Sequence, residues 1–378
     1  MMKQIARILA SAAVIGFAGA CASAGTGGPR DPSTGGAGST TGSTADQNVS
    51  ATGAVWPIKT REHVDLWLHG FAMVQEDTTF VPFFRRGYST NMTVLKNRAN
   101  VVSQLDANRD RLRARLVSNP QLINAQFIPL SFSSWDEIVQ LVNFFVRAEG
   151  NPRAASSQQE ANAIAFLAAY FPSPADREWV RLFVNSLGDE RARFYQSYWA
   201  QQQRERRNVL DEVDAMWQGT YRPKIQRFLN NTQQAAGDVL LSLPLNGEGR
   251  SQSSGKLANV LTVTFPDRPT DAMDAIYVIA HEAVSSLANV AVIDNITPEQ
   301  RRTGIADRYT SSAAVRAGAL LLQRTAPEAL DGYMRYYLRS VNRPVGSNVA
   351  TTFATVFAVP DTIRDALNRQ LDVVLGGI

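Results

Sequence analysis

Residues 270–290 read TDAMDAIYVIAHEAVSSLANV, and this stretch decides how the C-terminal part of the chain folds. Thr270 is the predicted N-cap of a helix, and Asp271 and Asp274 favour its positively polarised first turn. Apolar residues then recur every three or four positions, at Ile276, Ile279, Ala283, Leu287 and Val290. That period predicts one buried helix face. Within this apolar stretch, His281 and Glu282 are the strongest candidates for chemistry in the chain.

Two apolar runs precede this helix, at residues 239–245 and 260–265. The Gly- and Ser-rich segment 246–257 joins them, so we expect a β-hairpin with a long loop. Most of the remaining chain has helical periodicity. Helices are expected at residues 64–71, 92–116, 134–147, 190–221, 311–323, 328–339 and 361–375, with further helix starts at Ser173 and Thr297 and a candidate strand at 124–132. The predicted class is α+β, predominantly α-helical, with a small antiparallel hairpin or sheet beside the helix that carries His281.

The five residues from His281 to Ser285 read HEAVS, which resembles the His-Glu-x-x-His motif of zincin metalloproteases. In that motif two histidines one turn apart bind a zinc ion, and the glutamate acts as general base toward the zinc-bound water. The order of the elements also resembles an uncharacterised lipoprotein-like family of bacterial metalloproteases. The resemblance covers the C-terminal third and implies a zincin-like fold for residues 236–378. It assigns His281 as first zinc ligand and Glu282 as base.

The motif departs from the family pattern at two ligands. Ser285 stands at the position of the second histidine, and no acidic residue occurs between Arg308 and Pro327, where a third ligand is expected. The only other histidines are His63 and His69, and a spacing of six places them about 120° apart on one helix. One of them could still join His281 and a carboxylate from across the fold. We therefore expect no cofactor, with zinc as the alternative, and interpret His281 and Glu282 as hydrogen-bonded polar groups of a core helix.

The N-terminus has the pattern of an export signal. Lys3 and Arg7 precede the apolar stretch 8–19, and residues 18–21, AGAC, resemble the lipobox of bacterial lipoproteins. The resemblance implies a signal peptide over residues 1–20 and lipidation of Cys21, the single cysteine of the chain. Ala22 after the cysteine favours the outer membrane in a cell with two membranes. The alternative is a secreted, unlipidated protein cleaved after Ala20 or Ala24.

Composition divides the rest of the chain. Residues 21–54 are rich in Gly, Ser and Thr and predict a flexible tether. Residues 55–235 form a helical N-terminal part and residues 236–378 the zincin-like part, with one globular unit over 55–378 as an alternative. Basic and acidic residues are interspersed, so no nucleic-acid partner is expected.

These observations predict a lipid-anchored envelope protein with a non-catalytic binding or structural role. The expected partners are the membrane, through the lipid, and a peptide or another envelope protein. The expected ligand site is a cleft between the strand 260–265 and the helix face 278–285. The aromatic stretch 80–88, FVPFFRRGY, is either part of a packed core or a groove for a peptide or glycan. The alternative function is a zinc-dependent peptidase that uses His281, Glu282 and ligands from elsewhere.

Overall fold

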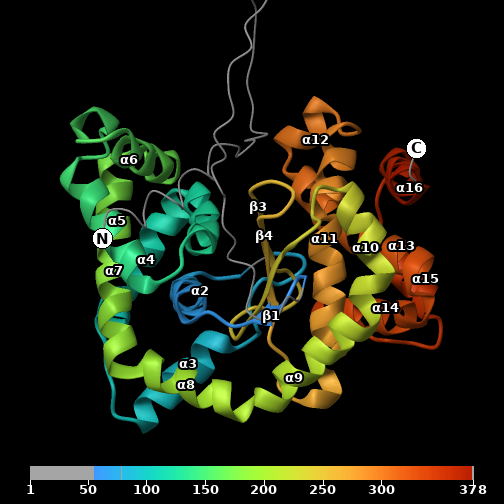
Figure 1. Ribbon diagram of the computed structural model, residues 1–378, viewed down its shortest axis with the longest axis horizontal. Helices are drawn as coiled ribbons and strands as arrows, with labels where there is room; N and C mark the ends of the chain where they lie inside the picture. Colours follow the sequence, from blue (N-terminus) through green and yellow to red (C-terminus); the bar gives the residue numbers. More distant parts are fainter. Residues whose placement is uncertain (1–54, 78, 377–378) are drawn as a thin grey trace, which may run out of the picture.

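The computed structural model describes residues 55–77 and 79–376 (Figure 1). The predicted signal peptide 1–20, the predicted lipidation site Cys21 and the predicted tether 21–54 lie outside these residues. The described chain is predominantly helical and contains one small mixed sheet, which confirms the predicted α+β class. In Figure 1 the sheet stands between two groups of helices, with α2 to α8 on its left and α9 to α16 on its right.

The sheet has the order β1-β2-β4-β3. Its strands are β1 (Ile58–Lys59), β2 (Gly237–Ser242), β3 (Arg250–Ser253) and β4 (Asn259–Thr264). The predicted hairpin between the apolar runs 239–245 and 260–265 is wrong, because β2 pairs with β4 in parallel, with Val239 opposite Leu261. The polar segment between them contains β3, which runs antiparallel to β4. β3 returns the chain to the end of the sheet where β2 began, so β4 runs in the same direction as β2.

Among the described residues, six helices make up most of the N-terminal half, and capping residues predicted where two of them begin. They are α2 (Glu62–Val74), α3 (Tyr88–Arg98), α4 (Gln104–Ser118), α5 (Trp135–Arg147), α6 (Gln158–Tyr170) and α7 (Pro174–Glu190), with the short 3-10 turn η2 (Pro152–Ala154). Ser134 and Ser173 are the N-caps of α5 and α7, as predicted. The single helix expected at 92–116 is wrong. It is two helices, because Ser103 starts α4 with its own capping box.

The candidate strand at 124–132 is also wrong. Residues Pro120–Ser131 form a 3-10 helix, η1. Its buried apolar residues Leu122, Ala125 and Ile128 are spaced by three. That spacing fits the three residues per turn of a 3-10 helix and places them on one side of it.

A chain of helices links the two halves along the lower rim of the molecule in Figure 1. From α7 it continues through the π turn η3 (Arg191–Tyr195), α8 (Gln196–Glu205), α9 (Arg207–Met216), the π turn η4 (Trp217–Tyr221) and α10 (Arg222–Asn231). The predicted uninterrupted helix over 190–221 is therefore wrong. Arg206 separates α8 from α9, and two π turns interrupt the α-helical hydrogen bonding.

The C-terminal half surrounds the helix that carries His281. Its elements are η5 (Pro269–Asp271), α11 (Met273–Ile293), α12 (Pro298–Arg302), α13 (Ile305–Thr325), η6 (Pro327–Ala329), α14 (Leu330–Ser340), α15 (Val349–Val356) and α16 (Asp361–Gly376). Thr297 caps α12 as predicted. Thr270 does not cap α11, because it lies inside the 3-10 turn η5 and Ala272 takes the N-cap position. Val290 was expected to be buried but is 46% exposed, since the last turns of α11 reach the surface.

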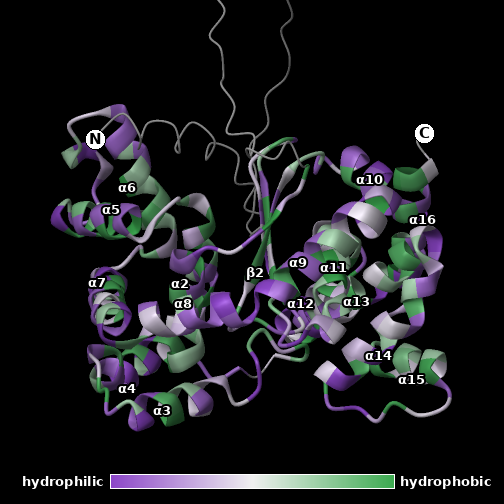
Figure 2. Ribbon diagram, turned by 60° about the horizontal axis from the view of Figure 1, so that its bottom comes forward, coloured by the Kyte–Doolittle hydropathy of each residue, from purple (hydrophilic) through white to green (hydrophobic). Residues whose placement is uncertain are grey.

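The sheet separates two hydrophobic cores, as the apolar strands between the two helical groups in Figure 2 indicate. Val239 and Leu241 of β2 face the core of the C-terminal half, whereas Leu240 faces the core of the N-terminal half. This alternation follows from the two-residue period of a strand. The core of the C-terminal half also contains residues of α9 and α10, which precede residue 235 in the chain.

Helix α11 is central to that core. The stretch Pro269–Ile293 is long and apolar enough to cross a membrane by length and composition, but 67% of its most apolar 18-residue window is buried inside the protein. Burial on this scale identifies α11 as the core helix around which α13, α14 and α16 pack.

Candidate functional site

The motif residues His281 and Glu282 lie in the middle of α11 and are almost fully buried, at 3% and 6% exposure. One carboxylate oxygen of Glu282 accepts a hydrogen bond from the backbone N–H of Gly249, at 2.9 Å. Nδ1 of His281 lies 3.0 Å from the same oxygen. A Cβ atom on Gly249 would come within 2.3 Å of the carbonyl oxygen of Thr262, so only glycine brings its N–H this close to Glu282. The carboxylate is therefore held by two donors.

Two further charged residues adjoin this pair. Glu248 accepts a hydrogen bond from the Ser311 hydroxyl, at 3.0 Å, and burial raises the pKa of its carboxyl group. The guanidinium of Arg250 is buried 3.7 Å from the ring centroid of Phe83, and Nε of Arg250 donates to Gln126. Burial lowers the pKa of Arg250. Neither residue was predicted as part of the site, because their burial depends on where the segment after β2 closes over α11.

The contacts of Glu282 decide whether its carboxyl group is ionised. Burial alone would raise its pKa, but the hydrogen bonds from His281 and Gly249 and the charge of Arg250 outweigh burial and lower it. Glu282 is thus ionised, and the charges of Glu282 and Arg250 act favourably on each other without a direct ion pair among the described residues. This attraction offsets part of the cost that either charge would carry alone in the interior.

Tyr337 covers one face of the His281 imidazole ring. The two rings stack with centroids 5.5 Å apart, and the Tyr337 hydroxyl donates to the carbonyl of Gly247, at 3.0 Å. Among residues 55–77 and 79–376, Nε2 of His281 has no hydrogen-bond partner. Ser285, at the degenerate motif position, donates to the backbone carbonyl of Glu282 within its own helix. That bond engages the proton of its hydroxyl group.

The structure places His63 and His69 on α2, as predicted, but with partners of their own. Nε2 of His63 lies 2.9 Å from the carbonyl oxygen of Phe132, and burial lowers the pKa of His63 to about 4. His69 lies between the Tyr88 hydroxyl, at 3.1 Å, and the carboxylate of Glu190, at 3.2 Å. Across the described part of the chain, no three His, Cys, Asp or Glu side chains are placed to hold a metal ion.

His69 belongs to a second buried polar cluster, formed by α2, α3, α4 and α7. Glu190 is its centre and accepts hydrogen bonds from Lys96, at 2.6 Å, and from Ser103. Glu190 is 0% exposed and Lys96 is 1% exposed, so both charges lie in the interior. Burial would raise the pKa of Glu190, but the bonds from His69, Lys96 and Ser103 hold it at about 2. The cluster joins four helices of the N-terminal half.

The predicted cleft between the strand 260–265 and the helix face 278–285 is wrong, because these surfaces pack against each other. Val263 and Phe265 lie in the same core as Val278, Ile279 and Ala283, and all five are buried. Apolar side chains therefore fill the space in which a ligand was expected.

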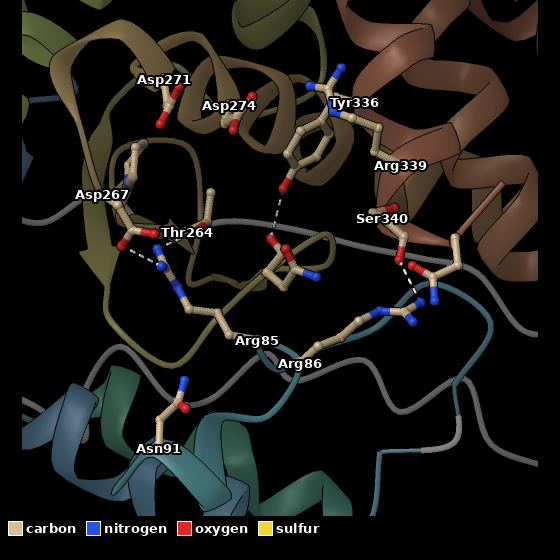
Figure 3. A pocket seen from close by; sticks show the side chains of 13 residues that line it. Arg85, Arg86, Asn91, Thr264, Asp267, Asp271, Asp274, Tyr336, Arg339 and Ser340 are labelled. Atoms are coloured by element: carbon tan, nitrogen blue, oxygen red, sulfur yellow. Dashed lines mark hydrogen bonds and ion pairs between the residues drawn. The ribbon is translucent and has the colours of Figure 1, made fainter. Parts of the chain in front are cut away.

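A pocket of about 440 Å³ lies beyond the end of this packed face (Figure 3). The parallel strands β2 and β4 both end at this edge of the sheet. Thr264 at the end of β4, and Asn246 and Pro266 from the segments that follow the two strands, line the pocket. The carboxyl ends of parallel strands are a common place for a ligand site, since the loops that leave them diverge there. The remaining walls come from residues before α3, from the start of α11 and from α14.

Side chains of both charges line this pocket. Figure 3 shows Asp267, Asp271 and Asp274 on the side formed by the β4–α11 segment, and Arg339 on the side formed by α14. Arg85 and Arg86, from the aromatic stretch 80–88, complete the lining, whereas Phe84 of that stretch is buried in the core. The packed-core interpretation therefore holds for Phe84, and the groove for a peptide or glycan stays a prediction.

Some of these charges neutralise one another and some do not. Asp267 is paired with Arg85 and Arg206, each at 2.6 Å, and Asp271 with Arg268, at 2.9 Å. Within residues 55–77 and 79–376, neither the carboxylate of Asp274 nor the guanidinium of Arg339 has a hydrogen bond or ion pair. Burial raises the pKa of Asp274 to about 6. The sequence suggested only a helix-dipole role for Asp274 and gave no signal for Arg339.

Comparison of the chain with protein-family models, with curated proteins and with solved structures finds no match in any of the three. The function is therefore inferred from the geometry of the two sites above.

Proposed function

We propose that this protein is a lipid-anchored binding protein of the cell envelope and that its ligand site is the pocket of Figure 3. The observation that carries the proposal is that Asp274 and Arg339 line a 440 Å³ pocket and have no hydrogen bond or ion pair among the described residues. Such a pair gives a small polar ligand defined points of attachment, and the volume falls in the range of small-molecule sites. The first turn of α11 lines this pocket through Asp274, whereas the motif residues His281 and Glu282 are not part of its lining.

The contacts of Glu282 support a non-catalytic role for the motif. A general base needs a carboxylate directed at an accessible water, but this one accepts from Gly249 and His281 and faces Arg250 in the interior. We propose that the motif residues stabilise the packing of the 247–250 segment on α11.

One observation favours a second candidate, a metal-dependent hydrolase. Nε2 of His281 is buried and has no partner in the described part of the chain, and the charges of Glu248 and Glu282 are close enough to act on each other. A zinc ion held there would need Glu248 and Glu282 to exchange their present bonds for metal coordination.

Binding at the pocket is tested by substituting one unpaired residue. Thermal unfolding is measured with a panel of small organic acids, amines, amino acids and dipeptides, first with the wild-type protein and then with Arg339→Gln. We expect at least one member of the panel to raise the melting temperature of the wild type and to do so less in the variant. If no compound stabilises the wild type, or if Arg339→Gln leaves every shift unchanged, the pocket is not the ligand site.

The proposed anchor gives a separate prediction. Cys21→Ser removes the thiol that would carry the lipid, so we expect the variant to move from the membrane pellet to the soluble fraction of the cell. Ser23→Ala, two residues further on, should leave the protein in the pellet. A wild-type protein that is already soluble, or a Cys21→Ser variant that stays in the pellet, would exclude a lipid anchor at this residue.

A further inference from the structure

We propose that the ligand of the Figure 3 pocket is zwitterionic, a small molecule with an ammonium group and a carboxylate, such as an amino acid or a short peptide. This inference rests on the proposed function, because it names the chemical class that the same pocket would accept. It follows from which charged side chains of the lining have no ion pair within the described residues and can bind a ligand.

The acidic wall leaves one carboxylate for a ligand. Asp267 already faces two arginines and Asp271 is bound by Arg268. Asp274 is half-buried at the start of α11 and points into the pocket with no partner among the described residues. A partly desolvated carboxylate gains most from a nearby positive charge. The charge of Arg339 acts on Asp274 without an ion pair between them, so a ligand ammonium is the group that would contact the carboxylate directly.

The basic wall leaves guanidinium N–H groups for a ligand. Arg339 of α14 has no partner in the described chain, and Arg86 uses one nitrogen to donate to the carbonyl of Ser340, at 3.0 Å. Arginine presents several donors in a planar fork that matches a carboxylate. Arg86 and Arg339 can therefore bind the anionic group of a ligand whose ammonium contacts Asp274.

The presence of both walls discriminates against ligands of a single charge. A purely anionic ligand would bring a second negative charge toward Asp274, and a purely cationic one would bring a positive charge toward Arg339. Like-charge contacts of this kind oppose binding. Between the walls, the buried Tyr336 ring gives an apolar surface, and its hydroxyl is engaged with the carbonyl of Asn246, at 3.2 Å. Tyr336 thus leaves the charge recognition to the two walls.

Calorimetric titration with three probes tests the class. The probes are alanyl-alanine, its N-acetylated form without the ammonium, and its C-terminal amide without the carboxylate. We expect the free dipeptide to bind the wild type, and each blocked form to bind at least about tenfold more weakly, which corresponds to about 1.4 kcal/mol. In Asp274→Asn the free and acetylated forms should bind equally. In Arg339→Gln the free and amidated forms should bind equally.

Arg335→Gln is the matched control, because Arg335 lies on the same helix, is exposed and pairs with Asp331 outside the pocket. It should leave all three affinities unchanged. If the acetylated form binds the wild type as tightly as the free dipeptide and Arg339→Gln weakens both, the zwitterion inference is wrong and the binding function stands. If none of the probes, nor any member of the earlier panel, binds the wild type, both are wrong.

Discussion

Glu282→Ala is expected to lower the free energy of unfolding by about 3–5 kcal/mol, because it removes two hydrogen bonds to a buried charged group, each worth about 1.5–3 kcal/mol. The carboxylate holds the Gly249 N–H at 2.9 Å and the His281 imidazole at 3.0 Å, and its charge acts favourably on the buried Arg250. Without it, the Gly249 N–H remains in the interior without its acceptor, and Arg250 loses one of the negative charges that act on it. Urea unfolding followed by circular dichroism measures the loss.

Two comparisons make the Glu282 experiment specific. Glu282→Gln keeps the volume and a carbonyl acceptor for Gly249 but removes the charge, so its loss should be smaller than that of the alanine variant. Glu299→Ala, an exposed residue of α12, should change stability by no more than about 0.5 kcal/mol. In a metalloprotease the base is needed for the reaction and not for the fold. A Glu282→Ala variant as stable as the wild type would therefore refute the structural role.

Glu190→Ala is expected to cost a similar amount, about 3–5 kcal/mol, in the N-terminal half. The substitution leaves Lys96, which is 1% exposed, with Asp106 as its remaining acidic partner, and removes the acceptor of His69. The double variant Lys96→Met with Glu190→Gln removes both charges, so it should lose less stability than the two single losses added together. Glu178→Ala, on the surface of the same helix, should cost less than about 1 kcal/mol.

Glu190 also predicts that the stability of the protein depends on pH. The pKa of Glu190 is about 2 in the folded protein, below the ordinary value of 4.5. The unfolded chain therefore binds more protons than the folded one between these values, and stability falls as pH drops from 4.5 toward 2. At higher pH the contribution is fully present. Urea unfolding across this range should show a shallower acid loss for Glu190→Gln, and equal slopes in the two proteins would contradict the assignment.

Local signals predicted the helices well. Ser134, Ser173 and Thr297 each start a helix because a capping side chain acts on backbone groups only two or three residues away. The periodicity around His281 likewise predicted the core helix α11. His63 and His69 do lie on one helix, the condition under which their spacing keeps them apart.

The sheet could not be predicted from local signals, because its pairing depends on partners distant in sequence. β3 reads RSQS, which has no apolar alternation, and its strand conformation depends on β4 beside it. Without β3, the two apolar runs looked like neighbours in a hairpin. The short 3-10 helix η1 was mistaken for a strand for a related reason, since a brief apolar run fits more than one period.

The candidate sites, too, could be predicted only where their signal is local in the sequence. The motif pair was visible in the sequence, but Glu248 and Arg250 join it only because the segment after β2 closes on α11. The pocket depends still more on the tertiary fold. Its lining joins Arg86 to Ser340, which are 254 positions apart in the chain. Sequence reasoning placed the ligand site along the motif helix, whereas the structure fills that face and opens a pocket at its first turn.

The most direct test of this account is the zinc content of the protein. The chain is purified free of metal, reconstituted with zinc, passed through a desalting column and analysed by elemental mass spectrometry, alongside a His281→Ala variant treated identically. We expect only trace zinc in both proteins, because the Glu282 carboxylate is already bound by Gly249 and His281. Equimolar zinc in the wild type that disappears in His281→Ala would contradict it and establish the metal-dependent hydrolase as the better candidate.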